Sequence, residues 1–132
     1  MVPYKILIID DDTDDVEILA DAFKSSGVDS VHYVHTAMQA FMYLEEIKNM
    51  TDLPKLIVTD MHLPGITGHE FLMDLKTMEQ YKHIHVIVLS SHKSEREIEQ
   101  ARKLGADDYL VKPFTYAEYL KVAADLKAKA AL

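Results

Sequence analysis

Residues 6–12 read ILIIDDD, four apolar residues followed directly by three aspartates. An uninterrupted apolar run of this kind is typical of a short strand that is buried on both faces of a sheet. Similar runs recur along the chain, at residues 56–58 and 86–89 and, more weakly, at 31–34 and 109–111. The sequence therefore predicts five short strands.

Between these runs, apolar residues recur at spacings of three and four, which is the period of a helix with one buried face. The apolar stripes lie at residues 16–23, 37–47, 71–78, 98–104 and 119–126. Thr67, Ser94 and Thr115 are each followed three residues later by a glutamate, the capping-box pattern of a helix N-terminus. Gly27 and Gly105 stand where the first and fourth helices should end in a left-handed cap. The alternation predicts a doubly wound α/β fold, (βα)₅, in which right-handed crossovers join parallel strands.

The composition bounds the class of protein: the chain has 132 residues, a formal net charge of −8 and no cysteine. We expect one domain over residues 1–132, with its core at about 4–126 and no separate output domain. The lack of cysteine excludes a disulfide scaffold, a zinc finger and a thiol nucleophile. The excess of acidic groups argues against nucleic acid and anionic membranes as partners. The N-terminus has too short an apolar run for a signal peptide, so we expect a cytoplasmic protein.

Chemically active residues follow the predicted strands. In an open parallel sheet, function gathers at the carboxyl ends of the strands. Here those ends carry Asp10–Asp12, Asp60, Ser90 and Lys112. Converging carboxylates need a proton or a cation among them, and oxygen ligands of this kind favour Mg²⁺. An ammonium and a hydroxyl in the same pocket would hold phosphate oxygens, so the sequence predicts a Mg²⁺-assisted phosphoryl site with a carboxylate nucleophile.

The acidic run has a second interpretation, the start of a helix that favours acids near its positive end. That interpretation accounts for Asp14 and Asp15, to which we assign no catalytic role. It does not account for Asp10 and Asp11, because they end a buried strand. Asp12 we interpret as a helix cap rather than a metal ligand.

Four segments in this order resemble those of a known family, the receiver domain of bacterial response regulators of the single-domain, CheY-like kind. They are IIDDD at 8–12, IVTDMHLPG at 57–65 with Gly68 following, VLSS at 88–91 and GADDYLVKPF at 105–114. The resemblance covers the chain from Tyr4 to about Leu126. It implies a flavodoxin-like fold whose five parallel strands have the order 2-1-3-4-5.

The resemblance implies a role for each strand-end residue. Asp60 would accept a phosphoryl group from the phosphohistidine of a sensor histidine kinase or a histidine phosphotransfer protein. Asp10, Asp11, Asp60 and the backbone carbonyl of His62 would be the protein ligands of Mg²⁺. Lys112 would pair with Asp60 at rest and with a phosphoryl oxygen afterwards.

The resemblance also implies a switch. Ser90 would be the hydroxyl that moves towards the phosphate, Tyr109 the aromatic residue that turns inward, and the bond from Lys112 to Pro113 would be cis. Phosphorylation would repack the face made by residues 98–104, 109–111 and 119–126, which would bind a downstream protein. The protein would be a monomer or a phosphorylation-dependent dimer.

Two histidines stand beside these positions: His62 lies two residues after Asp60, and His92 two after Ser90. In the family both positions border the phosphoryl group and influence its lifetime. Our hypothesis is that their protonation tunes dephosphorylation near neutral pH.

Two other functions are open to such a chain: a phosphorylation-independent scaffold with a receiver fold, and a phosphohydrolase of the haloacid-dehalogenase type. The hydrolase signature Asp-x-Asp-x-Thr/Val would place threonine or valine where Asp14 stands, and its cap insertion does not fit within 132 residues. Scaffold members lack an acidic residue, the acceptor or the lysine, and this chain has all of them. We therefore expect a signalling domain rather than a turnover enzyme.

Overall fold

The structure is a computed structural model that describes residues 3–132, so the first two residues of the predicted domain lie outside the described residues. All five predicted strands are present. They are β1 (Ile6–Ile9), β2 (Val31–Val34), β3 (Leu56–Thr59), β4 (His85–Ser90) and β5 (Asp108–Val111). The helices between and after them are α1 (Thr13–Ser25), α2 (Ala37–Glu46), α3 (Gly68–Thr77), α4 (Glu95–Lys103) and α5 (Tyr116–Lys129). A 3₁₀ turn, η1 (Met50–Asp52), interrupts the long connection into β3.

The strands form one parallel sheet with the order β2-β1-β3-β4-β5, which confirms the expected doubly wound fold. Its register positions the strand ends. Ile9 pairs with Thr59, so Asp10 and Asp60 leave the sheet side by side. The end of β5 pairs with the end of β4, which brings Lys112 to the same edge.

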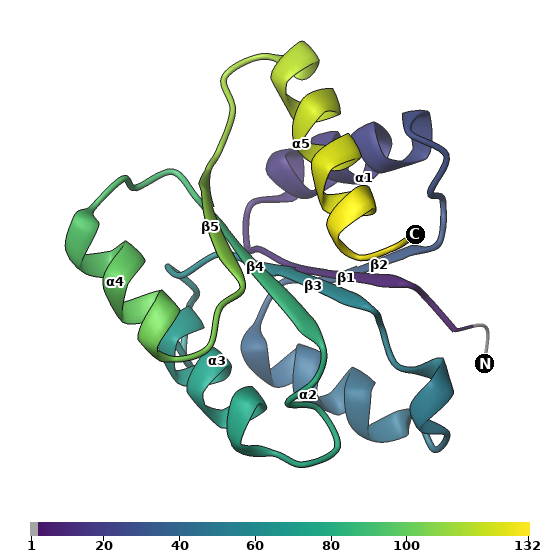
Figure 1. The fold of residues 1–132 in the computed structure, drawn as a ribbon, viewed down its shortest axis with the longest axis vertical. Coiled ribbons are helices and arrows are strands. Elements are labelled where there is room, and N and C mark those ends of the chain that lie inside the picture. Colours follow the sequence, from purple (N-terminus) through teal and green to yellow (C-terminus); the bar gives the residue numbers. More distant parts are fainter. Residues whose placement is uncertain (1–2) are drawn as a thin grey trace.

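The helices cover the sheet in two layers. Figure 1 shows α1 and α5 on one face and α2, α3 and α4 on the other. An apolar cluster lies between the sheet and each helix layer. Alternate side chains of β1 and β3 belong to one cluster or the other. Every residue of these two strands is therefore buried, whereas the edge strands β2 and β5 are only partly covered. The uninterrupted apolar runs thus belong to strands with two covered faces.

Helix capping agrees with the sequence. Thr67, Ser94 and Thr115 are the N-caps of α3, α4 and α5, and each hydroxyl accepts a hydrogen bond from the glutamate backbone N–H three residues on. Gly27 has a φ of +94° and Gly105 a φ of +107°, the left-handed conformation expected at the helix ends. A cap of this kind contributes about 1 kcal/mol to helix stability.

No helix within residues 3–132 combines the length and the apolar character that crossing a membrane requires. Within the same residues, no peptide bond is cis. The bond between Lys112 and Pro113 is therefore trans, and the expectation of a cis bond is wrong for this structure. Trans is the lower-energy form of a peptide bond before proline.

Candidate functional site

Three carboxylates meet at the carboxyl edge of the sheet. Asp10 and Asp11 follow β1, and Asp60 follows β3. One carboxylate oxygen from each lies within 4.8 Å of the others, a spacing suited to shared coordination of one cation. Asp10 and Asp60 are 6% and 7% exposed, whereas Asp11 is exposed, so a cation held here would have a solvent side for water ligands. The donor set therefore fits a hard divalent metal.

The backbone around the site orients the two buried carboxylates. The N–H of Asp12 donates to Asp10 Oδ1 over 3.0 Å, and the N–H of His62 donates to Asp60 Oδ1 over 3.2 Å. Burial raises the pKa of Asp10 above its usual range, although the Lys112 ammonium and the Asp12 N–H oppose that shift. The second oxygen of each carboxylate, Oδ2, contacts Lys112.

Lys112 brings a cation into the pocket from the end of β5. Its Nζ lies 2.8 Å from Asp10 Oδ2 and 3.0 Å from Asp60 Oδ2. Burial by itself lowers the pKa of this lysine, but hydrogen bonds to the carboxylates of Asp10, Asp15 and Asp60 outweigh burial and raise the pKa. Lys112 is therefore held as an ammonium beside the Asp60 carboxylate.

Asp15 is a residue of this pocket that sequence reasoning did not assign. Its Oδ2 lies 2.7 Å from Lys112 Nζ, a shorter distance than either strand-end aspartate has. Asp12 is the N-cap of α1, as expected, and its side chain accepts from the Asp15 N–H at 3.1 Å. Asp15 is thus three residues into the helix, and side chains in a helix lean towards its N-terminus. A carboxylate at that position, in a helix that begins beside the strand ends, is the signal that could have found it.

Ser90 is the last residue of β4 and is fully buried. Its Oγ accepts a hydrogen bond from the N–H of His92 over 3.3 Å. Its backbone carbonyl accepts from the N–H of Lys112 over 2.8 Å. Ser90 therefore lies at the same sheet edge as Lys112, and its hydroxyl contacts the backbone of the loop that leads to α4.

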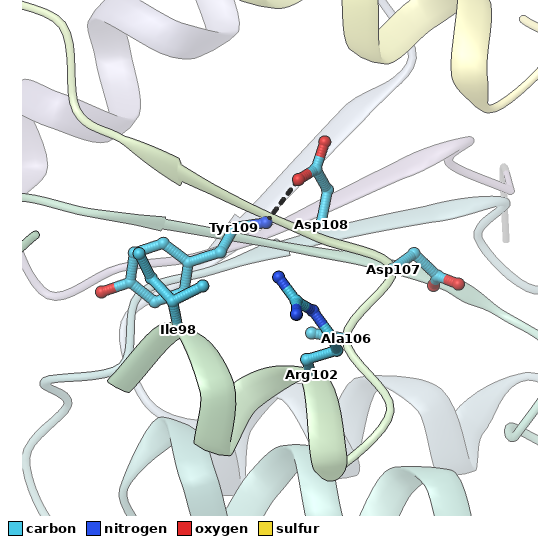
Figure 2. A pocket seen from close by; sticks show the side chains of 6 residues that line it. All are labelled: Ile98, Arg102, Ala106, Asp107, Asp108 and Tyr109. Carbon is cyan, nitrogen blue, oxygen red and sulfur yellow. Dashed lines mark hydrogen bonds between the residues drawn. The ribbon is translucent and has the colours of Figure 1, made fainter. Parts of the chain in front are cut away.

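Tyr109 lies on the α4 side of β5 with its ring half-buried. Its hydroxyl donates to the backbone carbonyl of His92 over 2.7 Å and lies 3.5 Å from Glu97 Oε2. Burial raises its pKa. Figure 2 shows the ring beside Ile98 at one end of a groove between α4 and β5, with the Arg102 guanidinium inside it. The groove has a volume of about 360 Å³.

The two histidines singled out from the sequence lie against each other. The ring centroids of His62 and His92 are 4.2 Å apart, and both side chains are exposed. His62 Nε2 lies 3.2 Å from Glu97 Oε1, so the pair is joined to the first turn of α4. The fold therefore brings together two residues whose backbone N–H groups contact Asp60 and Ser90.

Gly68, the first residue of α3, lies against the backbone of Asp60 and Met61. A Cβ added there would lie 2.4 Å from the Asp60 carbonyl oxygen and 2.6 Å from Met61 Cα. The N–H of Gly68 donates to the Met61 carbonyl over 3.1 Å. The start of α3 thus packs directly on the backbone that carries Asp60, and no side chain fits between them.

Carboxylates spaced for a cation, a buried ammonium and a hydroxyl at one sheet edge define an α/β protein suited to holding a phosphoryl group. The comparisons with known proteins agree. The family model "Response regulator receiver domain" matches residues 6–124. The chain therefore belongs to the response regulator receiver family.

Relatives and solved structures support this membership. The two-component response regulator ORR12 of Oryza sativa subsp. japonica is 31% identical, with 82% of this chain and 85% of that protein aligned. The phosphate regulon transcriptional regulatory protein PhoB of Pseudomonas aeruginosa is 35% identical over 97% of this chain, which spans only 52% of PhoB. The crystal structure of the phosphorylated cyanobacterial phytochrome response regulator RcpA superposes with a TM-score of 0.83 at 25% identity, covering 97% and 94% of the two chains.

The protein is thus a receiver domain of the two-component signalling type. Receivers of this family are signalling domains that interact with histidine kinases and downstream effectors. The haloacid-dehalogenase alternative is not supported, because the matching family model over residues 6–124 is that of a receiver domain.

Proposed function

We propose that Asp60 accepts a phosphoryl group from the phosphohistidine of a sensor histidine kinase or a histidine phosphotransfer protein. The observation that carries this proposal is the environment of its carboxylate. One oxygen accepts from the His62 N–H and the other from the Lys112 ammonium, at the edge where Asp10 and Asp11 converge. We propose a cytoplasmic location, because a sensor histidine kinase that uses ATP forms its phosphohistidine there.

The proposed transfer is a substitution at phosphorus. A carboxylate oxygen of Asp60 forms a bond to phosphorus while the phosphorus–nitrogen bond of the donor breaks. The imidazole leaves with the electron pair and gains a proton from solvent. The product on this chain is an acyl phosphate, and no net turnover is needed, so we regard the protein as a receiver rather than an enzyme.

Mg²⁺ is the metal we propose for the three carboxylates, with the backbone carbonyl of His62 as a fourth protein ligand. When bound, Mg²⁺ would neutralise charge on the transferred phosphoryl group. Lys112 and Ser90 would bind phosphoryl oxygens, because an ammonium and a hydroxyl at this edge are the remaining donors.

We propose that the phosphoryl state is communicated through Tyr109 and Ser90 to the face formed by α4, β5 and α5. Tyr109 bonds to the His92 carbonyl, and His92 is held to Ser90 through its N–H. Movement of the Ser90 hydroxyl would therefore release the loop that holds Tyr109. Residues 1–132 would act as one receiver unit whose face binds a downstream protein or a second copy after phosphorylation.

The placement of His62 beside Asp60 and of His92 beside Ser90 supports their proposed influence on phosphoryl lifetime. The His62 N–H contacts the proposed acceptor, Asp60, and the His92 N–H contacts the proposed switch hydroxyl, Ser90. The two rings contact each other at a tilt, with centroids 4.2 Å apart, so we treat them as a pair rather than as two independent side chains.

The test is phosphorylation by acetyl phosphate, read by intact mass, with and without Mg²⁺. We expect one Mg²⁺-dependent phosphoryl adduct on the native protein and none on the Asp60→Asn variant. Asp14→Asn is the matched control, because Asp14 is exposed and lies outside the pocket. An adduct that persists in Asp60→Asn would overturn the assignment. A complete lack of adduct with both acetyl phosphate and a panel of phosphorylated histidine phosphotransfer proteins would favour the scaffold.

A further inference from the structure

Lys112 has more acidic partners than phosphoryl transfer to Asp60 accounts for. Its ammonium lies within 3.0 Å of three carboxylate oxygens, from Asp10, Asp15 and Asp60. Asp10 belongs to the proposed metal site and Asp60 is the proposed acceptor. Asp15 has neither role, yet it makes the shortest of the three contacts, at 2.7 Å.

Of these three carboxylates, Asp15 alone takes no direct part in the proposed metal binding and phosphoryl transfer. A cation among Asp10, Asp11 and Asp60 would compete with Lys112 for the carboxylates of Asp10 and Asp60. Phosphorylation would convert Asp60 into an acyl phosphate, so the Lys112 ammonium would then face a phosphoryl oxygen in place of Asp60 Oδ2. Asp15 lies outside the group of carboxylates spaced for a metal, so its oxygen stays available to Lys112 before, during and after the transfer.

Asp15 is also placed rigidly. It lies in the first turn of α1, where its backbone N–H is bound by Asp12, and the next residue, Val16, is buried in the core. Its side chain is 29% exposed, which keeps the ion pair partly shielded from solvent. Lys112, by contrast, has a long flexible stem that takes its direction from whatever holds its ammonium. The helix therefore fixes the Asp15 carboxylate, and that carboxylate helps to set the position of the Lys112 ammonium.

We propose that Asp15 is a positioning residue for phosphoryl transfer to Asp60: it holds the Lys112 ammonium where an incoming phosphoryl oxygen will lie. This inference rests on the proposed function. Asp15 acts through Lys112, so its contribution exists only when that lysine is present.

The experiment uses acetyl phosphate as donor under saturating Mg²⁺. The Asp60 carboxylate forms a bond to phosphorus, the bond from phosphorus to the acetyl oxygen breaks, and acetate leaves with the electron pair, so charge is conserved. Rates are compared for the native protein, Asp15→Asn and Asp14→Asn. Asp14→Asn removes the same charge from the same turn of α1 but touches nothing in the pocket. We expect Asp15→Asn to slow phosphorylation about tenfold and Asp14→Asn to change it less than about twofold.

A second pair of variants tests whether Asp15 acts through the lysine. In a Lys112→Met background, followed by intact mass over hours, Asp15→Asn should have less than about a twofold effect, because there is no ammonium left to position. An equal slowing in both backgrounds would overturn the proposal, since Asp15 would then act on the charge of the whole pocket. Equal rates for Asp15→Asn and Asp14→Asn in the Lys112 protein would overturn it as well.

A readout independent of phosphorylation is the ¹H–¹⁵N spectrum of lysine ammonium groups in the metal-free protein. The Lys112 signal, assigned by its loss in Lys112→Met, should shift or vanish in Asp15→Asn and stay unchanged in Asp14→Asn. An unchanged signal in Asp15→Asn would contradict the contact itself. A native protein that forms no adduct would remove the proposed function, whereas a phosphorylated native protein with an indifferent Asp15→Asn variant would remove only the role of Asp15.

Discussion

Replacing Gly68 by alanine tests how tightly the fold holds Asp60. The added Cβ would lie 2.4 Å from the Asp60 carbonyl oxygen and 2.6 Å from Met61 Cα. Unstrained contacts between such atoms are about 3.5 Å, so the start of α3 and the Asp60 backbone must separate by roughly 1 Å. Both contacts are to backbone, which cannot turn aside as a side chain could.

The expected cost follows from that displacement. Overpacking of a closed site costs typically about 1–3 kcal/mol, and a contact with backbone on both sides belongs at the upper end, about 2–3 kcal/mol. For a chain of this size that lowers Tm by about 6–12 °C. A shift of about 1 Å at a reacting group costs up to about a hundredfold in rate, so phosphorylation of Gly68→Ala should slow by at least about tenfold.

The matched control is Gly65→Ala, in the loop that leads into α3. Gly65 has a φ of +75°, and no atom lies within 4 Å of the position that an added Cβ would take, so its replacement strains the backbone without pushing on Asp60. We expect a loss of about 1–2 kcal/mol with a phosphorylation rate within about twofold of the native protein. Thermal unfolding and acetyl phosphate kinetics measure both effects. A Gly68→Ala variant with native Tm and native rate would refute the close approach.

Three further predictions concern pH, metal and lifetime. Burial lowers the pKa of His32 and of His69 below the ordinary value of 6.5, so the folded state favours the neutral rings and the unfolded chain binds protons first. The free energy of unfolding should therefore be fully retained above pH 6.5 and should fall as the pH drops below it. Urea unfolding from pH 7.5 to 5 should show a smaller loss of that free energy in His32→Phe than in the native protein. An equal loss in the two proteins would contradict the assignment. Asp11→Asn should weaken Mg²⁺ binding by at least about tenfold, because one of three converging carboxylates is lost, and isothermal titration of the metal-free protein measures this. Replacing His62 or His92 by glutamine should change the rate of phosphoryl decay, because the two rings contact each other beside Asp60 and Ser90. A double variant that decays like either single one would show that the two rings act as a pair. Decay identical to the native protein in all three variants would sink the idea.

Much of the candidate site could be predicted because strand ends are a local property of the sequence. Asp10, Asp60 and Lys112 each follow a recognisable apolar run, and parallel strands bring their ends to one edge. The order of the strands came from the family resemblance, and the structure confirms it.

The contacts that escaped prediction connect residues far apart in the chain. Asp15 and Lys112 are separated by 97 positions, and their contact depends on how α1 packs on the sheet beside α5. A run of acids at a helix start is explained equally well by the helix dipole, so the sequence could not show which of them faces the pocket. The bond of the Tyr109 hydroxyl to the His92 carbonyl, and the contact between the His92 and His62 rings, depend in the same way on the placement of α4.

The sequence by itself determined the elements, their caps and the residues at each strand end, because periodicity, capping and turn preferences act over a few neighbouring residues. Tertiary structure alone decided which charges meet. The register of Ile9 with Thr59 sets Asp10 beside Asp60, and the first turn of α1 adds Asp15 to Lys112. Ion pairs and close packing act over a few ångströms in space, and only the folded sheet and helices convert positions along the chain into such distances.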